Sequence, residues 1–407
     1  MNQNKLKILY LTRTGLLEPL GQSQVLNYMR GLSKDYIINV ISYEKPEDFS
    51  DKVSMDNVKS DCEAHQIRWL PQLFQTKRSF FVFVVNFLKM IWIVRREVRQ
   101  EGINLIHARS YIPAFVALIA NKLTSVPFIF DMRALWPEEL INSGRIKRRS
   151  FLHRFILIVE RLCLLKSVAV VSLTNAAINY LKSVYPYEMK DKNIVVIPTC
   201  ANLNKFIPIN NSNYHKTHGC IGTVLSSWFL KDWLANWFQV VAMHDPNASF
   251  EIVTRDLAKN VRAIIDPTNK LEKRLNIYSQ QSEEMPSVLQ RHDLSIMFFT
   301  KGLSKLGSAP TRMAEALGCG LPIVVNEGVG DVADIVRKYN VGIVVEEGTK
   351  EHMKKAFESF LILLKDPELN DRCRNTAEIL FSLDYGIKSY DKIYKSVIPG
   401  NDKSCVA

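Results

Sequence analysis

The stretch KLGSAPTRMAEALGCGLPIVVNEGVGD, residues 305–331, predicts one helix followed directly by one buried strand. Ser308 is expected to cap the helix and Pro310 to lie in its first turn, because both residue types favour a helix start. Gly318 marks the expected helix end. The apolar run 322–326 then has the length and composition of a buried strand. A helix that leads into a buried strand indicates an α/β fold.

The same alternation recurs on both sides of this stretch. Short apolar runs bounded by turn residues predict strands at 7–11, 37–42, 104–107, 127–130, 168–173 and 193–197, and then at 220–225, 249–254, 294–299, 322–326 and 342–345. Amphipathic stretches of helical length separate them, which is typical of parallel sheets with crossover helices. We therefore predict an α/β protein of two doubly wound, Rossmann-like domains that face each other across a cleft.

The chain length and one polar segment predict the domain organisation. A chain of 407 residues is long enough for two hydrophobic cores. The periodic pattern fades after residue 208 and restarts with a new apolar run. We place an amino-terminal domain at 1–208, a linker at 209–218, a second domain at 219–384, and at 385–407 a helix that crosses back toward the first domain, with a tail.

The composition restricts the class of partner. A net charge of +12 favours an anionic partner such as a phosphate-bearing substrate, a nucleic acid or a lipid surface. The sequence has no helix-turn-helix, zinc-finger or aromatic RNA-binding signal, which argues against nucleic acid. Seven cysteines without CxxC spacing predict neither a disulfide framework nor a zinc site. With no secretory signal at the amino end, a cytoplasmic location is expected.

Ligands of open α/β sheets bind beyond the carboxyl ends of the strands, so the loops there hold the candidate residues. Gly21 lies in the first such loop, where backbone N–H groups at a helix start favour an anion. A glycine needed only for a turn explains the same residue. His107 and Arg109 end a later strand, where a histidine is often a hydrogen-bonded structural residue.

Charged residues cluster in FDMRALWPEEL, residues 130–140, directly after a predicted strand. A carboxylate such as Asp131 or Glu139 could orient an acceptor hydroxyl or take its proton, and Arg133 could hold a phosphate. We select these three residues with His107 as catalytic candidates. A loop rim held by salt bridges is the alternative interpretation.

The helix predicted to start at Ser308 carries the most specific signal. Free N–H groups and the positive end of the helix dipole suit a diphosphate. Glu315 follows on the same helix and can reach ribose hydroxyls while the phosphates lie at the helix start. The alternative is an ordinary capped core helix.

These segments resemble the family 4 glycosyltransferases, which are retaining enzymes of GT-B fold in bacterial polysaccharide and glycan biosynthesis. SAPTRMAEALGCGLPIVVNEGVGD is similar to the family's nucleotide-sugar-binding stretch. PLGQSQVLNYMRGLS, IHARSYIPAFVA, FDMRALWPEE, VVSLTNAAINYL and VIPTCANLNKF resemble its amino-terminal domain in matching order. The resemblance covers residues 7–394. It implies an acceptor-binding domain at 1–208 and a nucleotide-sugar-binding domain at 219–384.

By this resemblance, Glu315 matches the second glutamate of the family's E-x7-E motif, while the first is replaced by Gly307. The family's basic pair for the donor diphosphate is replaced by Ser226, Ser227 and Lys231, and Arg255 and Arg312 are candidate substitutes. The predicted donor-binding set is Gly21, Arg109, Gly222, Ser226, Lys231, Arg255, Ser308, Thr311, Arg312 and Glu315.

The implied reaction transfers a sugar, with retention, from a UDP- or GDP-linked donor to a lipid-linked or polysaccharide acceptor. No residue is assigned as a covalent nucleophile, so the leaving diphosphate is expected to be stabilised electrostatically. No metal and no cofactor beyond the donor substrate is expected. One alternative is a GT-B nucleotide-sugar epimerase. The other is a binding protein of this fold that has lost its catalytic activity, which the replacement of the first glutamate by Gly307 would allow.

Two segments suggest a membrane surface as a further partner. The apolar run 80–94 is interrupted by Asn86 and Lys89 and is short for a membrane span of ~20 residues, which suits an interfacial or a buried helix. RIKRRSFLHR, residues 145–154, could attract anionic lipid at ~1 kcal/mol per base, or be a solvated loop. We expect peripheral contact with the inner face of the plasma membrane.

Overall fold

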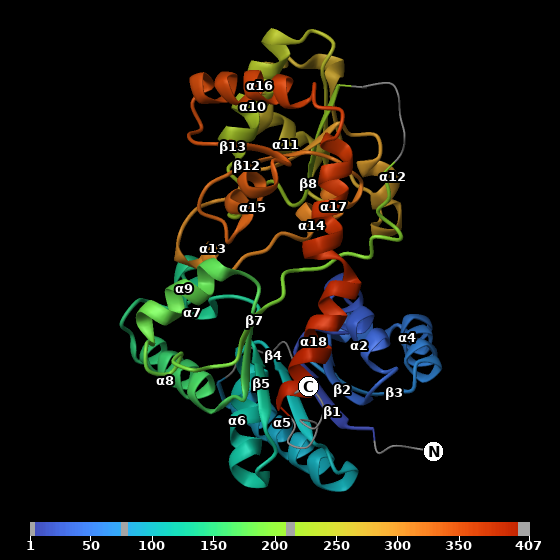
Figure 1. The fold of residues 1–407 in the computed structure, drawn as a ribbon, viewed down its shortest axis with the longest axis vertical. Helices are drawn as coiled ribbons and strands as arrows, with labels where there is room; N and C mark the ends of the chain where they lie inside the picture. Colours follow the sequence, from blue (N-terminus) through green and yellow to red (C-terminus); the bar gives the residue numbers. More distant parts are fainter. Residues whose placement is uncertain (1–4, 75–79, 209–215, 398–407) are drawn as a thin grey trace, which may run out of the picture. The chain divides into compact units, whose positions relative to one another are not determined.

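The computed structural model describes residues 5–74, 80–208 and 216–397. The chain divides into two compact units, which we call unit 1 (Met1–Ile197 with Gly386–Ala407) and unit 2 (Pro198–Tyr385). Each unit holds one parallel sheet with helices packed around it (Figure 1). The predicted fold class of two doubly wound α/β domains is therefore confirmed.

Unit 1 is built on a seven-stranded parallel sheet. The strand order is β3-β2-β1-β4-β5-β6-β7. Strands β2 and β3 are added on one side of β1, and strands β4 to β7 on the other side. The strands are β1 (Lys7–Thr12), β2 (Ile37–Glu44), β3 (Ile67–Leu73), β4 (Leu105–Arg109), β5 (Phe128–Asp131), β6 (Ala169–Ser172) and β7 (Ile194–Val196). Every residue of β4, β5 and β6 is buried, as expected for strands covered by helices on both faces.

The helices of unit 1 occupy the connections between its strands, and the last helix of the chain joins them. They are α1 (Pro19–Gly21), a π-helical turn (Gln22–Leu26), α2 (Asn27–Leu32), α3 (Pro46–Ser50), α4 (Lys52–Ala64), α5 (Phe80–Glu101), α6 (Tyr111–Thr124), α7 (Trp136–Asn142), α8 (Phe151–Lys166), α9 (Asn175–Val184) and α18 (Leu383–Val397). Among the described residues, no helix is long and apolar enough to cross a membrane.

Unit 2 is built on a six-stranded parallel sheet of order β10-β9-β8-β11-β12-β13. Its strands are β8 (Thr217–Ile221), β9 (Ser249–Val253), β10 (Leu275–Tyr278), β11 (Leu294–Met297), β12 (Ile323–Asn326) and β13 (Gly342–Val345). Side chains of alternate residues pack on opposite faces: Ile323 and Val325 belong to one apolar cluster and Val324 to the other. The period of two therefore builds a core on each side of the sheet.

The helices of unit 2 cover these two faces. They are α10 (Lys231–His244), α11 (Ala258–Ile265), α12 (Met285–Leu289), α13 (Leu303–Leu306), α14 (Thr311–Gly318), α15 (Val332–Tyr339), α16 (Lys350–Leu363) and α17 (Leu369–Phe381), with short 3-10 turns at Glu272–Arg274 and Ser282–Glu284. Residues of α10 and α16 pack in one cluster, and residues of α14 and α17 in the other.

Ten of the predicted strands lie within one or two residues of an observed one, and the eleventh is misplaced. The run 220–225 was expected as the first strand of the second domain, but β8 is Thr217–Ile221 and ends before Gly222. The φ of Gly222 is +148°, a conformation that residues with a side chain rarely adopt, so the chain leaves the sheet there. Two edge strands, β3 and β10, were not predicted.

The division of the chain differs from the predicted boundary at 208. Residues 198–208 belong to unit 2, because Ala201, Leu203 and Phe206 are buried in its core. Of the predicted linker at 209–218, residues 209–215 lie outside the described residues, whereas Thr217 and His218 are part of β8. The segment VIPTCANLNKF, assigned by resemblance to the amino-terminal domain, therefore lies mostly in unit 2.

Candidate functional site

The carboxyl edge of the sheet in unit 1 brings together several predicted catalytic residues. Arg109 ends β4, and Asp131 ends β5 opposite Arg109. His107 lies in the middle of β4, two residues before the end at which it was predicted. The Nε2 atom of His107 lies 3.3 Å from Asp131 Oδ2, and an Arg133 terminal nitrogen lies 3.6 Å from Asp131 Oδ1. Adjacent parallel strands end at the same edge, which brings these residues together, and their catalytic roles stay predictions.

Two tyrosines of α18 close this cluster, and sequence reasoning did not find them. The Tyr394 hydroxyl lies 2.6 Å from Nδ1 of His107, and the Tyr390 hydroxyl donates to Asp131 Oδ2 at 3.0 Å. Arg133 in turn donates to the Tyr390 hydroxyl at 3.2 Å. Both tyrosines are buried. Their spacing of four residues on one helix face is the only signal that the sequence offered.

The electrostatics of the cluster follow from burial and pairing. Burial lowers the pKa of His107, so the ring is neutral, with its proton on the nitrogen that faces the carboxylate. Burial alone would raise the pKa of Asp131, but Arg133 and the hydrogen bond from His107 outweigh it and lower that pKa to about 2. Asp131 is therefore a buried carboxylate that stays ionised, held by its protein partners.

His107 and Asp131 expose no surface to solvent. As placed, they contact Arg133, Tyr390 and Tyr394 rather than an open site. The surroundings of His107 are therefore those of a hydrogen-bonded structural histidine, which was the alternative interpretation. Its catalytic role stays a prediction. Of the four catalytic candidates only Glu139 is partly exposed, in the first turn of α7.

The backbone and side chain of Arg133 are both unusual. Its φ of +56° places a large residue in the left-handed region, which carries a conformational cost. The Nε and one terminal nitrogen of its buried guanidinium have no hydrogen-bond partner among the described residues. The pairing with Asp131 holds this strained residue in place.

The loop after β1 differs from the predicted anion site. Its backbone N–H groups at Leu16 and Leu17 donate to the buried carboxylate of Glu44, at 2.9 and 3.1 Å. The anion at this loop is thus a side chain of the protein itself. A Cβ atom on Gly21 would collide with the carbonyl oxygen of Gly15, so close backbone packing explains this glycine. Gly21 has right-handed helical backbone angles, so a turn does not require the glycine, and its donor-binding role stays a prediction.

The start of α14 in unit 2 also differs in detail from the prediction. The helix begins at Thr311 with Pro310 as its N-cap residue, so the predicted cap at Ser308 is wrong. Proline has no side-chain acceptor, and the structure shows no side-chain cap bond at this helix start. The Thr199 hydroxyl anchors the preceding turn by donating to the Ala309 carbonyl at 2.7 Å. Ser308 to Arg312 are all partly exposed.

Arg312 and Glu315 pair with each other on α14. The guanidinium of Arg312 donates to a carboxylate oxygen of Glu315 one turn along the helix. The Glu315 side chain is 12% exposed, and burial raises its pKa although the arginine opposes the shift. The guanidinium of such a pair can donate hydrogen bonds to a phosphate, and the carboxylate can accept them from the two hydroxyls of a ribose.

The other predicted donor-binding residues lie on loops of unit 2 that follow its strands. Gly222 begins the loop after β8, where a Cβ atom would crowd the ring of Phe229. Ser226 is partly exposed in the same loop, Lys231 is the first residue of α10, and Arg255 is exposed after β9. The structure shows no direct contact that joins these four residues to α14, and their donor-binding roles stay predictions.

A short turn and two loops of unit 2 are tied together beside α14. Thr300 donates its N–H to the carbonyl of Trp228 at 2.9 Å, which joins the loops after β11 and β8. The ammonium of Lys305, a buried residue, lies 2.8 Å from the centre of the Trp228 indole ring. The N–H of Gly330 donates to the Lys305 carbonyl at 2.9 Å. These contacts order the strand-end loops of unit 2, and sequence reasoning missed the role of Lys305 in them.

Comparison with known proteins agrees with this architecture. A family model for Glycosyltransferase Family 4 matches residues 22–205, and a model for glycosyl transferases group 1 matches residues 244–379. No curated protein matches the sequence significantly.

Several solved structures are similar along nearly their whole length. A glycosyltransferase from Rickettsia africae ESF-5 has a TM-score of 0.71 and 16% identity, over 98% of this chain and 100% of its own. Sucrose-phosphate synthase from Thermosynechococcus elongatus has a TM-score of 0.68 and 14% identity, over 96% and 99%. HepE of Anabaena in complex with UDP has a TM-score of 0.68 and 16% identity, over 96% and 100%.

The two doubly wound domains agree with the fold of these structures, and the two family-model matches identify a GT-B glycosyltransferase. The chain belongs to the family 4 type of these enzymes, since its amino-terminal part matches the Family 4 model and its carboxyl-terminal part the group 1 model.

Proposed function

We propose that this glycosyltransferase moves a sugar from a nucleoside-diphosphate sugar, UDP- or GDP-linked, to a lipid-linked or polysaccharide acceptor in cell-surface glycan biosynthesis. The observation that carries the proposal is the partly exposed start of α14 with the Arg312–Glu315 pair one turn behind it. Its structural neighbour HepE was solved with UDP and with UDP-glucose, which supports a nucleotide-sugar donor.

The donor diphosphate would lie at the amino end of α14. In the described part of the chain no side chain caps this helix start, so the N–H groups of Thr311 and Arg312 can bind an anion, and the helix dipole favours negative charge there. The next N–H group, of Met313, donates to the Pro310 carbonyl at 3.1 Å. Thr311 and Arg312 would add a hydroxyl and a guanidinium, and Glu315 would accept hydrogen bonds from the ribose. Ser308 would lie at the entrance to this helix start.

The remaining donor contacts would come from the loops after β8 and β9. Ser226 and Lys231, with Gly222 beside them, replace the family's basic pair, and the exposed Arg255 can add positive charge. Because Gly307 has no carboxylate, the contact that the family's first glutamate makes with the donor sugar is missing. We therefore expect the specificity for the sugar to depend on other groups than that carboxylate.

In unit 1 the partly exposed Glu139 would orient the acceptor hydroxyl or receive its proton. His107 and Asp131 would act by positioning Arg133 and the turn that leads to α7, and Arg109, whose partner is the Tyr10 hydroxyl, would support the same edge. The transfer would proceed with retention, the diphosphate leaving under electrostatic stabilisation and without a resident metal.

Peripheral contact with an anionic membrane is part of the proposal. The outer face of α8 exposes large apolar side chains, with Phe151 87% and Ile158 57% exposed. The outer face of α5 adds Trp92, and the two faces are connected through α6, because the Phe115 ring contacts the rings of Phe87 and Phe155. Exposed bases lie on the same helices, which suits a lipid surface of negative charge.

The first test is the binding of nucleoside diphosphates to the full chain, measured by thermal unfolding. A ligand at 100 times its dissociation constant adds ~2.7 kcal/mol to the free energy of unfolding. We expect UDP or GDP to stabilise the protein in the presence of EDTA, and Glu315→Ala to reduce the effect. Incubation of the donor sugar without acceptor then separates the alternatives: an epimerised free sugar would identify an epimerase, and no nucleotide binding at all would identify a degenerate protein.

A further inference from the structure

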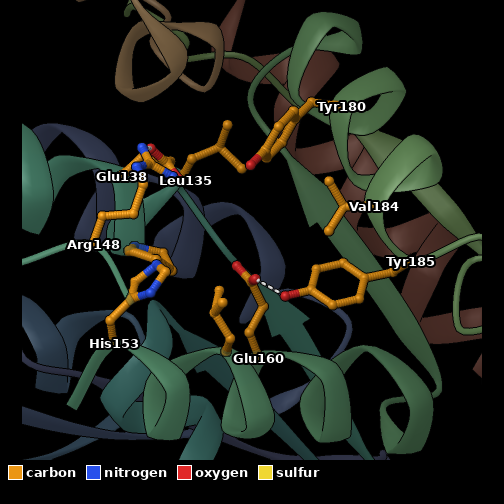
Figure 2. A pocket seen from close by; sticks show the side chains of 10 residues that line it. Leu135, Glu138, Arg148, His153, Glu160, Tyr180, Val184 and Tyr185 are labelled. Carbon is orange, nitrogen blue, oxygen red and sulfur yellow. Dashed lines mark hydrogen bonds and ion pairs between the residues drawn. The ribbon is translucent and has the colours of Figure 1, made fainter. Parts of the chain in front are cut away.

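Unit 1 contains a cavity between α7, α8 and α9, apart from the cluster at the carboxyl edge of its sheet. The volume is about 90 Å³, well above the ~10–15 Å³ that one water molecule needs. Figure 2 shows the side chains of Glu138, His153, Glu160 and Tyr180 converging on this space. The function proposed above uses none of these four residues.

The floor of the cavity is a carboxylate held in place by two phenols. Glu160 is buried, and its two oxygens accept hydrogen bonds from the hydroxyls of Tyr111, at 2.6 Å, and Tyr185, at 2.7 Å. Each carboxylate oxygen keeps a second lone pair, so Glu160 can still accept a donor from the cavity. Glu138 is different, because both its oxygens pair with the guanidinium of Arg148.

Whereas Glu160 offers the cavity a hydrogen-bond acceptor, His153 offers a hydrogen-bond donor. Its Nδ1 atom accepts the backbone N–H of Arg149 at 3.1 Å, so the proton of the neutral ring lies on Nε2. That Nε2 atom is buried and has no hydrogen-bond partner among the described residues. A buried donor without an acceptor is costly, and a ligand that accepts its proton removes the cost.

These two groups together select the ligand chemistry. A ligand must accept a hydrogen bond from His153 and donate one to Glu160, which a hydroxyl does and which neither a carboxylate nor an ammonium does. Leu135, Leu157 and Val184 add apolar lining, which suits carbon atoms. We infer that this cavity is a binding site for a neutral, hydroxyl-bearing ligand, the edge of a sugar ring being the example closest to the proposed function.

Access to the site is from one side. Glu138, His153, Glu160 and Tyr185 form the buried floor, whereas Arg148 and Val184 are exposed and Tyr180 is partly exposed at the rim. A ring held by its edge would leave its other groups outside. The inference rests on the proposed function only in naming a sugar, and it concerns unit 1 alone.

The probes for the test are methyl α-glucopyranoside and methyl α-galactopyranoside, with glucuronate as the anionic and glucosamine as the cationic comparison. Binding to the full chain is measured by saturation-transfer NMR. We expect the neutral glycosides to bind at least as tightly as glucuronate and glucosamine, which share ring hydroxyls but carry a charge that the site does not need. His153→Leu should weaken glycoside binding about tenfold, since it removes the buried Nε2 donor. Binding of glucosamine alone would overturn the ligand class.

A second variant, at an exposed position, tests the cavity even if the buried substitution His153→Leu destabilises the protein. Val184→Trp fills the rim from the surface without changing the buried floor, and is expected to abolish glycoside binding. Its matched control is Ile379→Trp on α17, another exposed apolar position. His244→Leu on α10 is the control for loss of a histidine. Glycoside binding that survives Val184→Trp, or a crystal structure with the glycoside that shows only ordered water in the cavity, would overturn the inference.

UDP distinguishes this inference from the proposed donor site. We expect UDP to leave glycoside binding unchanged, because the donor residues lie in unit 2. Thermal stabilisation by UDP without glycoside binding would overturn the cavity assignment only. Glycoside binding without any nucleotide effect would overturn the proposed donor function and leave the cavity assignment in place.

Discussion

The hydroxyl of Tyr394 lies 2.6 Å from Nδ1 of His107, although 287 residues separate the two along the chain. Since Nε2 of His107 faces the carboxylate of Asp131, the tyrosine hydroxyl must donate to Nδ1. The last helix of the protein thereby fixes the protonation pattern of a histidine at the carboxyl edge of the sheet in unit 1. It also buries that edge, which links the stability of the cluster to the docking of α18.

The hydrogen-bond network around Asp131 predicts graded losses of stability. Asp131→Asn leaves the buried guanidinium of Arg133 without its counter-charge and is expected to lower the free energy of unfolding by about 3 kcal/mol. Tyr394→Phe should cost about 1 kcal/mol. Denaturant unfolding checks both values, with the exposed Tyr187→Phe as a control that should change nothing. Equal effects of Tyr394→Phe and Tyr187→Phe would contradict the role of the hydroxyl.

Two buried histidines predict acid sensitivity. Burial lowers the pKa of His107, and lowers that of His218 to about 3, so both are neutral in the folded state. The unfolded chain has a histidine pKa near ~6.5 and binds more protons below that pH, so stability falls as the pH drops through it. The loss is up to ~1.4 kcal/mol per pH unit for each histidine.

Urea unfolding at pH 7.5, 6.0 and 5.0 measures this slope. His107→Gln should flatten it for unit 1 and His218→Gln for unit 2. Asp131 adds a separate loss at lower pH, between the unfolded value near ~3.9 and its folded pKa of about 2, because its carboxylate is stabilised by pairing. Slopes unchanged in both histidine variants would show that other groups govern the acid response.

The Arg312–Glu315 pair predicts how nucleotide binding fails in variants. Glu315→Ala removes the ribose acceptor and should weaken UDP or GDP binding by ~1–3 kcal/mol, as expected when a partner group is left unpaired. Arg312→Met should also weaken the binding of the nucleoside diphosphates, but not the binding of the nucleosides uridine and guanosine, which have no phosphate. Titration calorimetry compares them with Glu378→Ala, which breaks an exposed pair on α17. A control that weakens binding as much as Glu315→Ala would argue against a site at α14.

Gly21 predicts a stability effect rather than a binding effect. Gly21→Ala would place a methyl group against the carbonyl of Gly15 and is expected to destabilise the protein by about 2 kcal/mol. Gly144→Ala, where no atom lies within 4 Å of the new Cβ, should cost only about 1 kcal/mol for its left-handed backbone. Weaker ligand binding by Gly21→Ala at unchanged stability would restore the anion-site interpretation.

The exposed faces of α5 and α8 predict membrane binding that depends on charge. The protein should sediment with vesicles of phosphatidylcholine and phosphatidylglycerol and less with phosphatidylcholine alone. Phe151→Ser with Ile158→Ser should weaken this at least about tenfold, since each apolar side chain contributes ~1.5–3 kcal/mol when buried. Ile379→Ser on α17 is the matched control. A dimer by light scattering that the α8 variant abolishes would instead assign the face to a second copy.

Much of the fold was predictable from local pattern. Runs such as 128–131 and 323–326 are apolar, short and flanked by turn residues, and both are buried strands. The edge strands β3 and β10 were not predicted. The sequence of β3, IRWLPQL, contains a proline. The sequence of β10, LNIY, has only four residues, of which one is fully buried. Edge strands bury less side chain, so their pattern is weak.

The sequence by itself determined two parallel sheets, the family, the strands that carry His107 and Asp131 and the helix that carries Glu315, because periodicity and turn chemistry act over a few residues. Only the tertiary structure decided what those side chains contact. Glu44 fills the loop predicted to bind an anion, and Tyr394 reaches His107 from the far end of the chain. Such partners are chosen by the packing of elements distant in sequence, which no local pattern encodes.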